Sequence, residues 1–401
     1  MNASTPESQG FSAQGIANID RTLRSYIELK RVAGLTSMVA RHGQIVYHSA
    51  LGILDVEADK PMRQDAIFRI ASMTSPISSV AIMMLVEEGH FDLDTPIAAF
   101  IPEFKESKVL ESGSGDEIVL ADLEQDITVR HLFTQTSGLE GYFEDDGTTI
   151  EQMYHQKRVE LEQNNPPLTL SKMMRAVAKI PLAHQPGSCW AYGLGVYMLA
   201  YLVELVTNTP YEKFLQTRIF EPLKMVDTAY YIPPEKAHRL AGVHHYFAEE
   251  DQLKRHEFPW MNVPSQPPSY VEGGNLLLST MDDYARFAQM LLNKGELDGV
   301  RLLRPETVEL IASNHVSEDA LRNGFRDYHD GYGYGLGVRV CMDETQSDAA
   351  GSKGEYGWGG LYNTVFWVDP EKSLFGLLMI QQLGFSIAQE FKALVYEAMP
   401  M

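Results

Sequence analysis

Cysteine, long apolar runs and positive charge are what this chain of 401 residues has least of. Its two cysteines, Cys189 and Cys341, can form at most one disulfide, and such sparse use favours a reducing compartment. No apolar run approaches the 18 residues that predict a membrane-spanning helix. The first residues show no basic stretch followed by an apolar one, so no secretory signal is indicated. We therefore expect a cytoplasmic protein that does not contact a membrane.

Basic residues are outnumbered, with 33 Lys and Arg against 54 Asp and Glu and a formal net charge of −21. That balance disfavours nucleic acid and anionic membrane surfaces as partners. The pair His244-His245 has no second pair of ligands at zinc spacing, which disfavours a metal site. Neither a phosphate-binding glycine loop nor a Gly-x-Ser-x-Gly elbow occurs. We expect neither a metal nor a cofactor, and the sequence leaves the oligomeric state open.

What is present is a pattern of strands at both ends of the chain with helices between them. Residues 12–30 have the apolar period of an amphipathic helix, and 35–48 read as a hairpin around Gly43. Residues 364–368 and 374–380 read as two further strands. These strands predict an α/β (α+β) fold with one central antiparallel sheet built from both termini. We expect an α/β domain from residues 1–95 and 271–401, and an inserted, mainly helical domain from residues 96–270.

A short hydroxyl-rich motif, Ser72-Met73-Thr74-Ser75, precedes the apolar helical pattern of residues 77–88. Pro76 is tolerated only in the first turn of a helix, so Ser72 is expected at or just before the helix N-terminus. Free N–H groups at such an end favour a developing oxyanion. Ser72 and Ser75 are three residues apart and can share one face. By itself the motif also fits a simple helix N-cap.

Two later segments carry further candidates. Tyr192 lies in Pro186-Gly187-Ser188-Cys189-Trp190-Ala191-Tyr192-Gly193-Leu194, a turn before a helical run, and beside a cation a tyrosine oxygen can accept a proton from a serine. It is also one of 19 tyrosines. The second segment is Trp358-Gly359-Gly360-Leu361 at a strand start, where small residues let a substrate approach the backbone closely.

In their shared order these segments resemble the serine β-lactamase and penicillin-binding-protein superfamily, in its carboxylesterase branch, sometimes called family VIII. The resemblance spans residues 35 to 380 and includes two supporting stretches, residues 127–139 and 273–284. It implies a β-lactamase/transpeptidase-like fold in which Ser72 is the nucleophile and Tyr192 transfers protons. The N–H groups of Ser72 and Leu361 would form the oxyanion hole, and Trp358 would line the pocket beside Gly359 and Gly360.

One residue departs from the family pattern. The nucleophile motif normally reads Ser-x-x-Lys, and Ser75 stands where the lysine is expected. Without that amine, a tyrosine with an ordinary pKa near 10 is phenolate in only about one molecule in a thousand at pH 7. Three explanations remain open: a substitution introduced to trap a complex, a natural loss that leaves a binding protein, or replacement by another group such as Lys353. The otherwise intact site favours the first.

The sequence therefore predicts a serine carboxylesterase that acts on small-molecule esters through an acyl-Ser72 intermediate and is impaired by Ser75. The alternatives are acyl transfer or hydrolysis of β-lactams or D-amino-acid peptides within the same family, and a non-catalytic ligand-binding relative. The Tyr-Gly-Leu triplet at residues 192–194 departs from the Tyr-x-Asn of the β-lactamases and weakens the β-lactam alternative.

Overall fold

A computed structural model describes residues 1–142, 147–164, 167–256, 262–324, 330–347 and 350–399. Its centre is a sheet in which nine strands are identified among those residues, eight in the order β1-β3-β2-β17-β16-β15-β14-β13, with β4 pairing with β3. The strands are β1 (Asn2–Ala3), β2 (Gly34–Arg41), β3 (Gln44–Asp55), β4 (Lys60–Pro61), β13 (Tyr332–Tyr334), β14 (Arg339–Cys341), β15 (Tyr356–Gly360), β16 (Thr364–Asp369) and β17 (Leu374–Ile380).

The sheet joins the two ends of the chain, as the sequence predicted. Strand β17 pairs antiparallel with β2 from Leu374↔Arg41 to Ile380↔Leu35. The predicted antiparallel arrangement needs one correction, because the two-residue edge strand β1 runs parallel to β3. The β-lactamase/transpeptidase-like α/β architecture is confirmed, with a mixed central sheet between helices.

Alternation along β2 and β17 places apolar side chains on both faces of the sheet, as a sheet covered on two sides requires. Leu35, Val39 and Leu378 pack in a cluster with helices α1 (Ala13–Glu28) and α12 (Ala388–Glu397). Met38 and Leu377 belong to the larger core on the opposite face. Helix α9 (Met281–Leu292) covers that face and contacts β2, β16 and β17.

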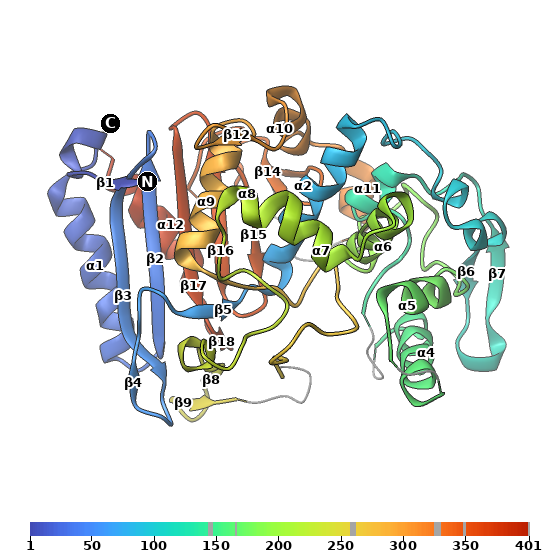
Figure 1. Cartoon of the computed structure of the whole chain (residues 1–401), viewed down its shortest axis with the longest axis horizontal. Helices are drawn as coiled ribbons and strands as arrows, with labels where there is room; N and C mark the ends of the chain where they lie inside the picture. Colours follow the sequence, from blue (N-terminus) through green and yellow to red (C-terminus); the bar gives the residue numbers. More distant parts are fainter. Residues whose placement is uncertain (143–146, 165–166, 257–261, 325–329, 348–349, 400–401) are drawn as a thin grey trace.

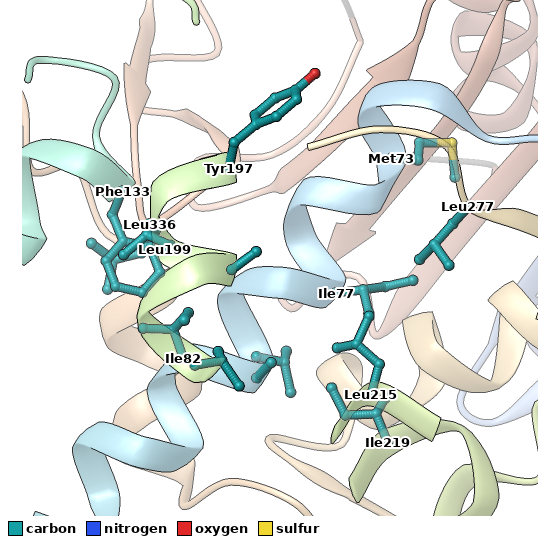
Figure 2. Close-up of a cluster of buried hydrophobic side chains, with 14 of the residues drawn as sticks. Met73, Ile77, Ile82, Phe133, Tyr197, Leu199, Leu215, Ile219, Leu277 and Leu336 are labelled. Atoms are coloured by element: carbon teal, nitrogen blue, oxygen red, sulfur yellow. The ribbon is translucent and has the colours of Figure 1, made fainter. Parts of the chain in front are cut away.

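The larger core continues into a helical layer that holds the nucleophile segment. Helix α2 (Thr74–Glu87) packs on α6 (Gly195–Thr207). Figure 2 shows Ile77 of α2 between Met73 and the side chains of Leu215 and Ile219. Tyr197 leaves α6 with its hydroxyl directed away from the apolar side chains. The other helices of this part are α3 (Val129–Phe133), α4 (Thr149–Asn164), α5 (Leu170–Val177), α7 (Tyr211–Leu215), α8 (Glu221–Leu223), α10 (Pro305–Ile311) and α11 (Glu318–Asn323).

The segment 96–270 contains strands as well as helices. Hairpin β6 (Lys108–Ser112) with β7 (Val119–Asp122) lies at the far end of the molecule from α1 (Figure 1). Hairpin β8 (His244–Phe247) with β9 (Gln252–Arg255) instead joins β18 (Gln382–Leu383), which is parallel to β8. The two-domain division stays a prediction. Two further pairs are β5 (Ile67–Arg69) with β10 (Leu278–Thr280), and β11 (Glu296–Leu297) with β12 (Val300–Arg301).

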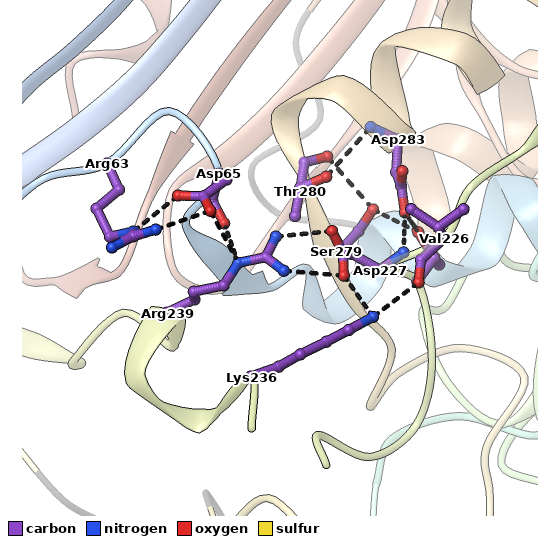
Figure 3. Close-up of polar contacts among 10 residues, drawn as sticks. Arg63, Asp65, Val226, Asp227, Lys236, Arg239, Ser279, Thr280 and Asp283 are labelled. Atoms are coloured by element: carbon purple, nitrogen blue, oxygen red, sulfur yellow. Dashed lines mark hydrogen bonds and ion pairs between the residues drawn. The ribbon is translucent and has the colours of Figure 1, made fainter. Parts of the chain in front are cut away.

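A polar network fastens the segment before the nucleophile to α9 (Figure 3). The Arg239 guanidinium donates to both carboxylate oxygens of Asp227, at 3.0 and 2.7 Å, and to the Asp65 backbone carbonyl at 2.8 Å. The buried Asp283 carboxylate accepts from the Asp227 N–H at 2.7 Å and from the Thr228 hydroxyl at 2.9 Å. Burial raises the pKa of Asp283 to about 6.

None of the described helices has the length and apolarity that crossing a bilayer demands.

Candidate active site

The turn that presents Ser72 is strained and anchored on several sides. Ser72 lies in a single 3-10 turn, Ala71–Met73, between β5 and α2, which confirms its predicted place just before a helix. Ala71 has a left-handed φ of 45°, which costs an alanine roughly 1–2 kcal/mol. The Tyr284 hydroxyl donates to the Met73 carbonyl at 2.9 Å, and the Thr364 hydroxyl donates to the Ile70 carbonyl at 3.3 Å. Strain held by surrounding contacts is typical of functional turns.

The glycines of β15 bring this strand against the nucleophile turn. A Cβ on Gly360 would lie 2.3 Å from the Ile70 carbonyl oxygen, so no larger residue fits there without movement. At Gly359 the nearest atom to such a Cβ would be the Thr364 carbonyl oxygen, at an ordinary 3.4 Å. Leu361 follows β15 in a turn and is 55% exposed. The predicted glycine strand therefore runs directly beside Ser72.

Hydrogen bonds to Gln135 hold the loop that carries Tyr192 in place. The Gln135 carbonyl accepts from the Ala191 N–H at 2.8 Å, and its side-chain oxygen accepts from the Gly193 N–H at 3.2 Å. The Tyr192 carbonyl accepts from the Gly141 N–H at 2.9 Å. Gln135 is buried with a left-handed φ of 57°. Gln135 therefore fixes the backbone on both sides of Tyr192.

One neighbour donates a hydrogen bond to the Tyr192 oxygen. The Trp358 indole N–H donates to it over 3.3 Å, and the rings of the two residues lie 5.7 Å apart. The Tyr142 ring meets the Tyr192 ring edge to face, with ring centres 6.0 Å apart, and burial raises the pKa of Tyr142 well above 10. A donor directed at the Tyr192 oxygen stabilises negative charge that develops on it.

Ser72, Tyr192 and Trp358 line one cavity of about 460 Å³, together with Gly359 and Gly360. Aromatic rings form one wall: Trp190 stacks on Tyr192 at 6.0 Å, and Tyr334 meets Trp358 edge to face at 5.2 Å. The structure thus brings these sequence-predicted residues together. Leu361 and Ser75 are not among the residues that line the cavity.

Ser75 lies beneath the site, 1% exposed, in the first turn of α2. Its hydroxyl has no hydrogen-bond partner among the described residues, and the same holds for the nearby hydroxyls of Thr74 and Ser79. Buried hydroxyls normally find partners, so three unpaired ones within six residues of α2 are unusual. Ser75 is the position at which the sequence resemblance led us to expect a lysine.

Two lysines, Lys353 and Lys392, bear on the prediction that another amine could take the place of the expected lysine. Lys353, the alternative considered from sequence, has an exposed side chain and does not line the cavity. Lys392 of α12 does line it, although no motif marks this residue. Its amine lies 2.7 and 2.6 Å from the two carboxylate oxygens of Glu355. Burial lowers the pKa of Lys392 and raises that of Glu355, while each opposes the shift of the other. Lys392 is thus committed to a buried ion pair.

Sequence reasoning also missed Tyr142, Tyr334 and Arg339 as lining or supporting residues, because no local motif marks them. Among the described residues, no group of three or more His, Cys, Asp or Glu side chains is arranged to hold a metal.

With this geometry in view, comparison with known proteins identifies the family. The sequence profile described as Beta-lactamase matches residues 19–395. The chain belongs to the Beta-lactamase family. Within this family, Protein Rv1367c of Mycobacterium tuberculosis is 33% identical over 366 residues, 90% of this chain and 88% of that one. Esterase EstB of Burkholderia gladioli is 30% identical over 399 residues, 94% of each chain.

Solved structures support the same fold. Simvastatin synthase (LovD) from Aspergillus terreus, in unliganded form, matches with a TM-score of 0.81 at 22% identity and covers 96% of this chain and 98% of its own. EstCE1, described as a hydrolase with promiscuous acyltransferase activity, matches with a TM-score of 0.77 at 23% identity and the same coverage. At these identities the likeness concerns the fold.

Proposed function

We propose that this member of the Beta-lactamase family is a serine hydrolase of carboxylic esters that works through an acyl-Ser72 intermediate. The observation that carries the proposal is the shared cavity of Ser72 and Tyr192, in which the Trp358 indole N–H donates to the Tyr192 oxygen. The 30% identity to Esterase EstB over 94% of both chains supports an ester as substrate.

In the proposed reaction the Ser72 hydroxyl attacks the ester carbonyl carbon while its proton passes to the Tyr192 oxygen. The carbonyl oxygen becomes an oxyanion and accepts from the N–H groups of Ser72 and Leu361. The bond to the alcohol then breaks, and Tyr192 returns the proton to the leaving oxygen. Water repeats the sequence on the acyl-enzyme and releases the acid.

Ser75 makes the first proton transfer slow, because serine supplies no cation beside Tyr192. The hydrogen bond from Trp358 supports charge on the Tyr192 oxygen in part, so we propose a low rather than a zero rate. Loss of one member of a coupled catalytic set commonly costs about 10⁴-fold or more in turnover.

The test is Ser75→Lys, assayed with a short-chain 4-nitrophenyl ester beside the unchanged protein and Ser72→Ala. We expect hydrolysis to rise by about 10⁴-fold and to vanish in the doubly substituted protein S72A/S75K. An unchanged rate in Ser75→Lys would refute the lysine argument. Tight ester binding without turnover in any variant would instead favour a ligand-binding relative.

Acyl transfer to an alcohol is the second candidate. Several relatives are named as acyltransferases, including Acyltransferase calJ of Penicillium decumbens at 27% identity. Adding alcohols to the Ser75→Lys assay separates the two reactions, because a transferase forms a new ester in water. A chromogenic cephalosporin in the same assay tests the β-lactam alternative.

Both cysteines are buried and form no disulfide, which supports the proposed cytoplasmic location.

A further inference from the structure

Four aromatic rings that line the cavity of Ser72 form one packed group. Tyr192 and Trp358 are partly exposed, and their ring centres lie 5.7 Å apart. Trp190 and Tyr334 are buried and meet each other edge to face at 5.2 Å. Trp190 stacks with Tyr192, and Tyr334 meets Trp358 edge to face. Tyr192 and Trp358 therefore present aromatic surface to the cavity, and two buried rings support them.

Contacts on more than one side hold the Trp358 ring in place. Its N–H donates to the Tyr192 oxygen, and the Tyr334 ring packs against it at 5.2 Å. A ring that is already fixed loses little conformational freedom when a ligand binds to it. Between aromatic rings, stacked and edge-to-face contacts strengthen binding by about 2- to 10-fold beyond the effect of the area that they bury.

The charged groups of the cavity decide between a neutral and a cationic ligand. Among its described lining residues these are Arg339, Glu355 and Lys392. The Lys392 amine is paired with the Glu355 carboxylate, and the Arg339 guanidinium lies over the Tyr332 ring, 4.0 Å from its centre. Aromatic rings attract cations as well as other rings. Two positive groups against one negative group disfavour a further cation here.

The proton path places the alcohol part of an ester beside these rings. The group that takes the Ser72 proton must return it to the leaving oxygen. With Tyr192 in that role, the leaving oxygen lies beside the Tyr192 oxygen, to which the Trp358 N–H is bonded. The group attached to the leaving oxygen then lies within reach of the Trp358 ring. The cavity volume of about 460 Å³ has room for a six-membered ring beside the ester.

We propose that the preferred substrates are neutral esters of arylmethyl alcohols, whose aromatic ring packs against Trp358 and Tyr192. Ser72 forms a bond to the carbonyl carbon, the bond from that carbon to the alcohol oxygen breaks, and the arylmethanol leaves with the proton from Tyr192. This inference rests on the proposed hydrolase function and adds the class of alcohol to it.

The test compares benzyl acetate with cyclohexylmethyl acetate in the Ser75→Lys protein. Both are esters of primary alcohols with a six-membered ring. Each kcat/KM is divided by the rate constant of hydrolysis by hydroxide, which removes the difference in intrinsic reactivity. A cavity that selects only apolar area would favour cyclohexylmethyl acetate, because its saturated ring has more apolar surface to bury. We expect benzyl acetate to be favoured by about 3- to 10-fold.

Two substitutions of Trp358 separate its ring from its N–H. Trp358→Phe keeps a ring, so it should lower both rates and retain the benzyl preference. Trp358→Leu removes the ring and should bring the ratio to one or below. Tyr356→Leu is the matched control, because Tyr356 is a buried ring of the same strand that does not line the cavity, and its ratio should stay unchanged. Taking the ratio within each variant cancels any loss of folded protein.

A ratio at or below one in the Ser75→Lys protein, or an unchanged ratio in Trp358→Leu, would overturn the proposal and leave the hydrolase function intact. The acetate ester of choline and its neutral isostere 3,3-dimethylbutyl acetate test the charge. A higher normalised rate for the choline ester would show that the rings select a cation and would also overturn the proposal.

If none of these esters is cleaved, the hydrolase proposal itself fails. Ligand-detected NMR titrations of benzyl alcohol and cyclohexylmethanol against Ser72→Ala then decide on the cavity. Tighter binding of benzyl alcohol that is lost on adding Trp358→Leu supports the aromatic site. Equal binding of the two alcohols, no binding, or binding that Trp358→Leu leaves unchanged refutes it.

Discussion

The indole N–H of Trp358 donates a hydrogen bond to the phenolic oxygen of Tyr192 across 3.3 Å. The two residues are 166 positions apart in the chain. The bond joins strand β15 of the central sheet to the loop before α6, and it directs a donor at the oxygen that is proposed to accept the Ser72 proton.

Trp358→Phe should therefore slow acylation while preserving the aromatic wall. Removing one donor from a developing charge costs about 10- to 100-fold. Burst kinetics with a 4-nitrophenyl ester in the Ser75→Lys protein measure the step. A full burst rate in Trp358→Phe would show that this bond does not assist Tyr192.

Gly360→Ala and Gly359→Ala form a matched pair. The added methyl at position 360 would lie 2.3 Å from the Ile70 carbonyl oxygen, and at position 359 its nearest contact is 3.4 Å. We expect Gly360→Ala to lower the free energy of unfolding by about 1–3 kcal/mol and to lower acylation by about 10²-fold. Gly359→Ala should change both much less. Denaturant titration and burst kinetics measure the two quantities, and equal effects of the two substitutions would contradict the close approach of β15 to the nucleophile turn.

Asp283 should make stability fall as the pH rises. Burial raises its folded-state pKa to about 6, above the ordinary value of 3.8, so the folded protein binds the proton more tightly than the unfolded chain. Its stabilising effect is full below pH 3.8 and is lost as the pH rises through about 6.

Asp283→Asn keeps an oxygen that can accept from the Asp227 N–H and removes the titration. Between pH 4 and 6.5 it should flatten the dependence of unfolding free energy on pH, with an effect of about 1–3 kcal/mol at pH 7. Urea titrations across that range measure it. Asp282→Asn, at an exposed neighbour in the same helical turn, is the control. Parallel pH profiles for Asp283→Asn and the unchanged protein would refute the shift.

Elements with a strong apolar period were predictable from sequence. The helix after Ser72, the hairpin of β2 with β3 and the pair β16–β17 all lie where the pattern placed them. Each repeats one spacing over several residues, and each buries the side chains that carry it.

The features missed depend on long-range contacts. Ala71 adopts a left-handed φ that alanine rarely adopts, so its sequence position does not predict it, and surrounding packing holds it there. The β6–β7 hairpin lies in a segment that we predicted to be mainly helical, and most of its side chains are exposed and show no alternation of apolar residues. The hydrogen bonds of Gln135 to the Tyr192 loop join positions 56 to 58 residues apart, which no local motif indicates.

Covalent labelling of Ser72 tests the proposed chemistry most directly. The unchanged protein and Ser72→Ala are each incubated with a 4-nitrophenyl ester, quenched in acid, digested and analysed by mass spectrometry. We predict an acyl adduct on the peptide that contains Ser72, formed slowly in the unchanged protein, rapidly in Ser75→Lys, and absent from Ser72→Ala. An adduct that persists in Ser72→Ala, or no adduct on Ser72 even in Ser75→Lys, would contradict Ser72 as the nucleophile.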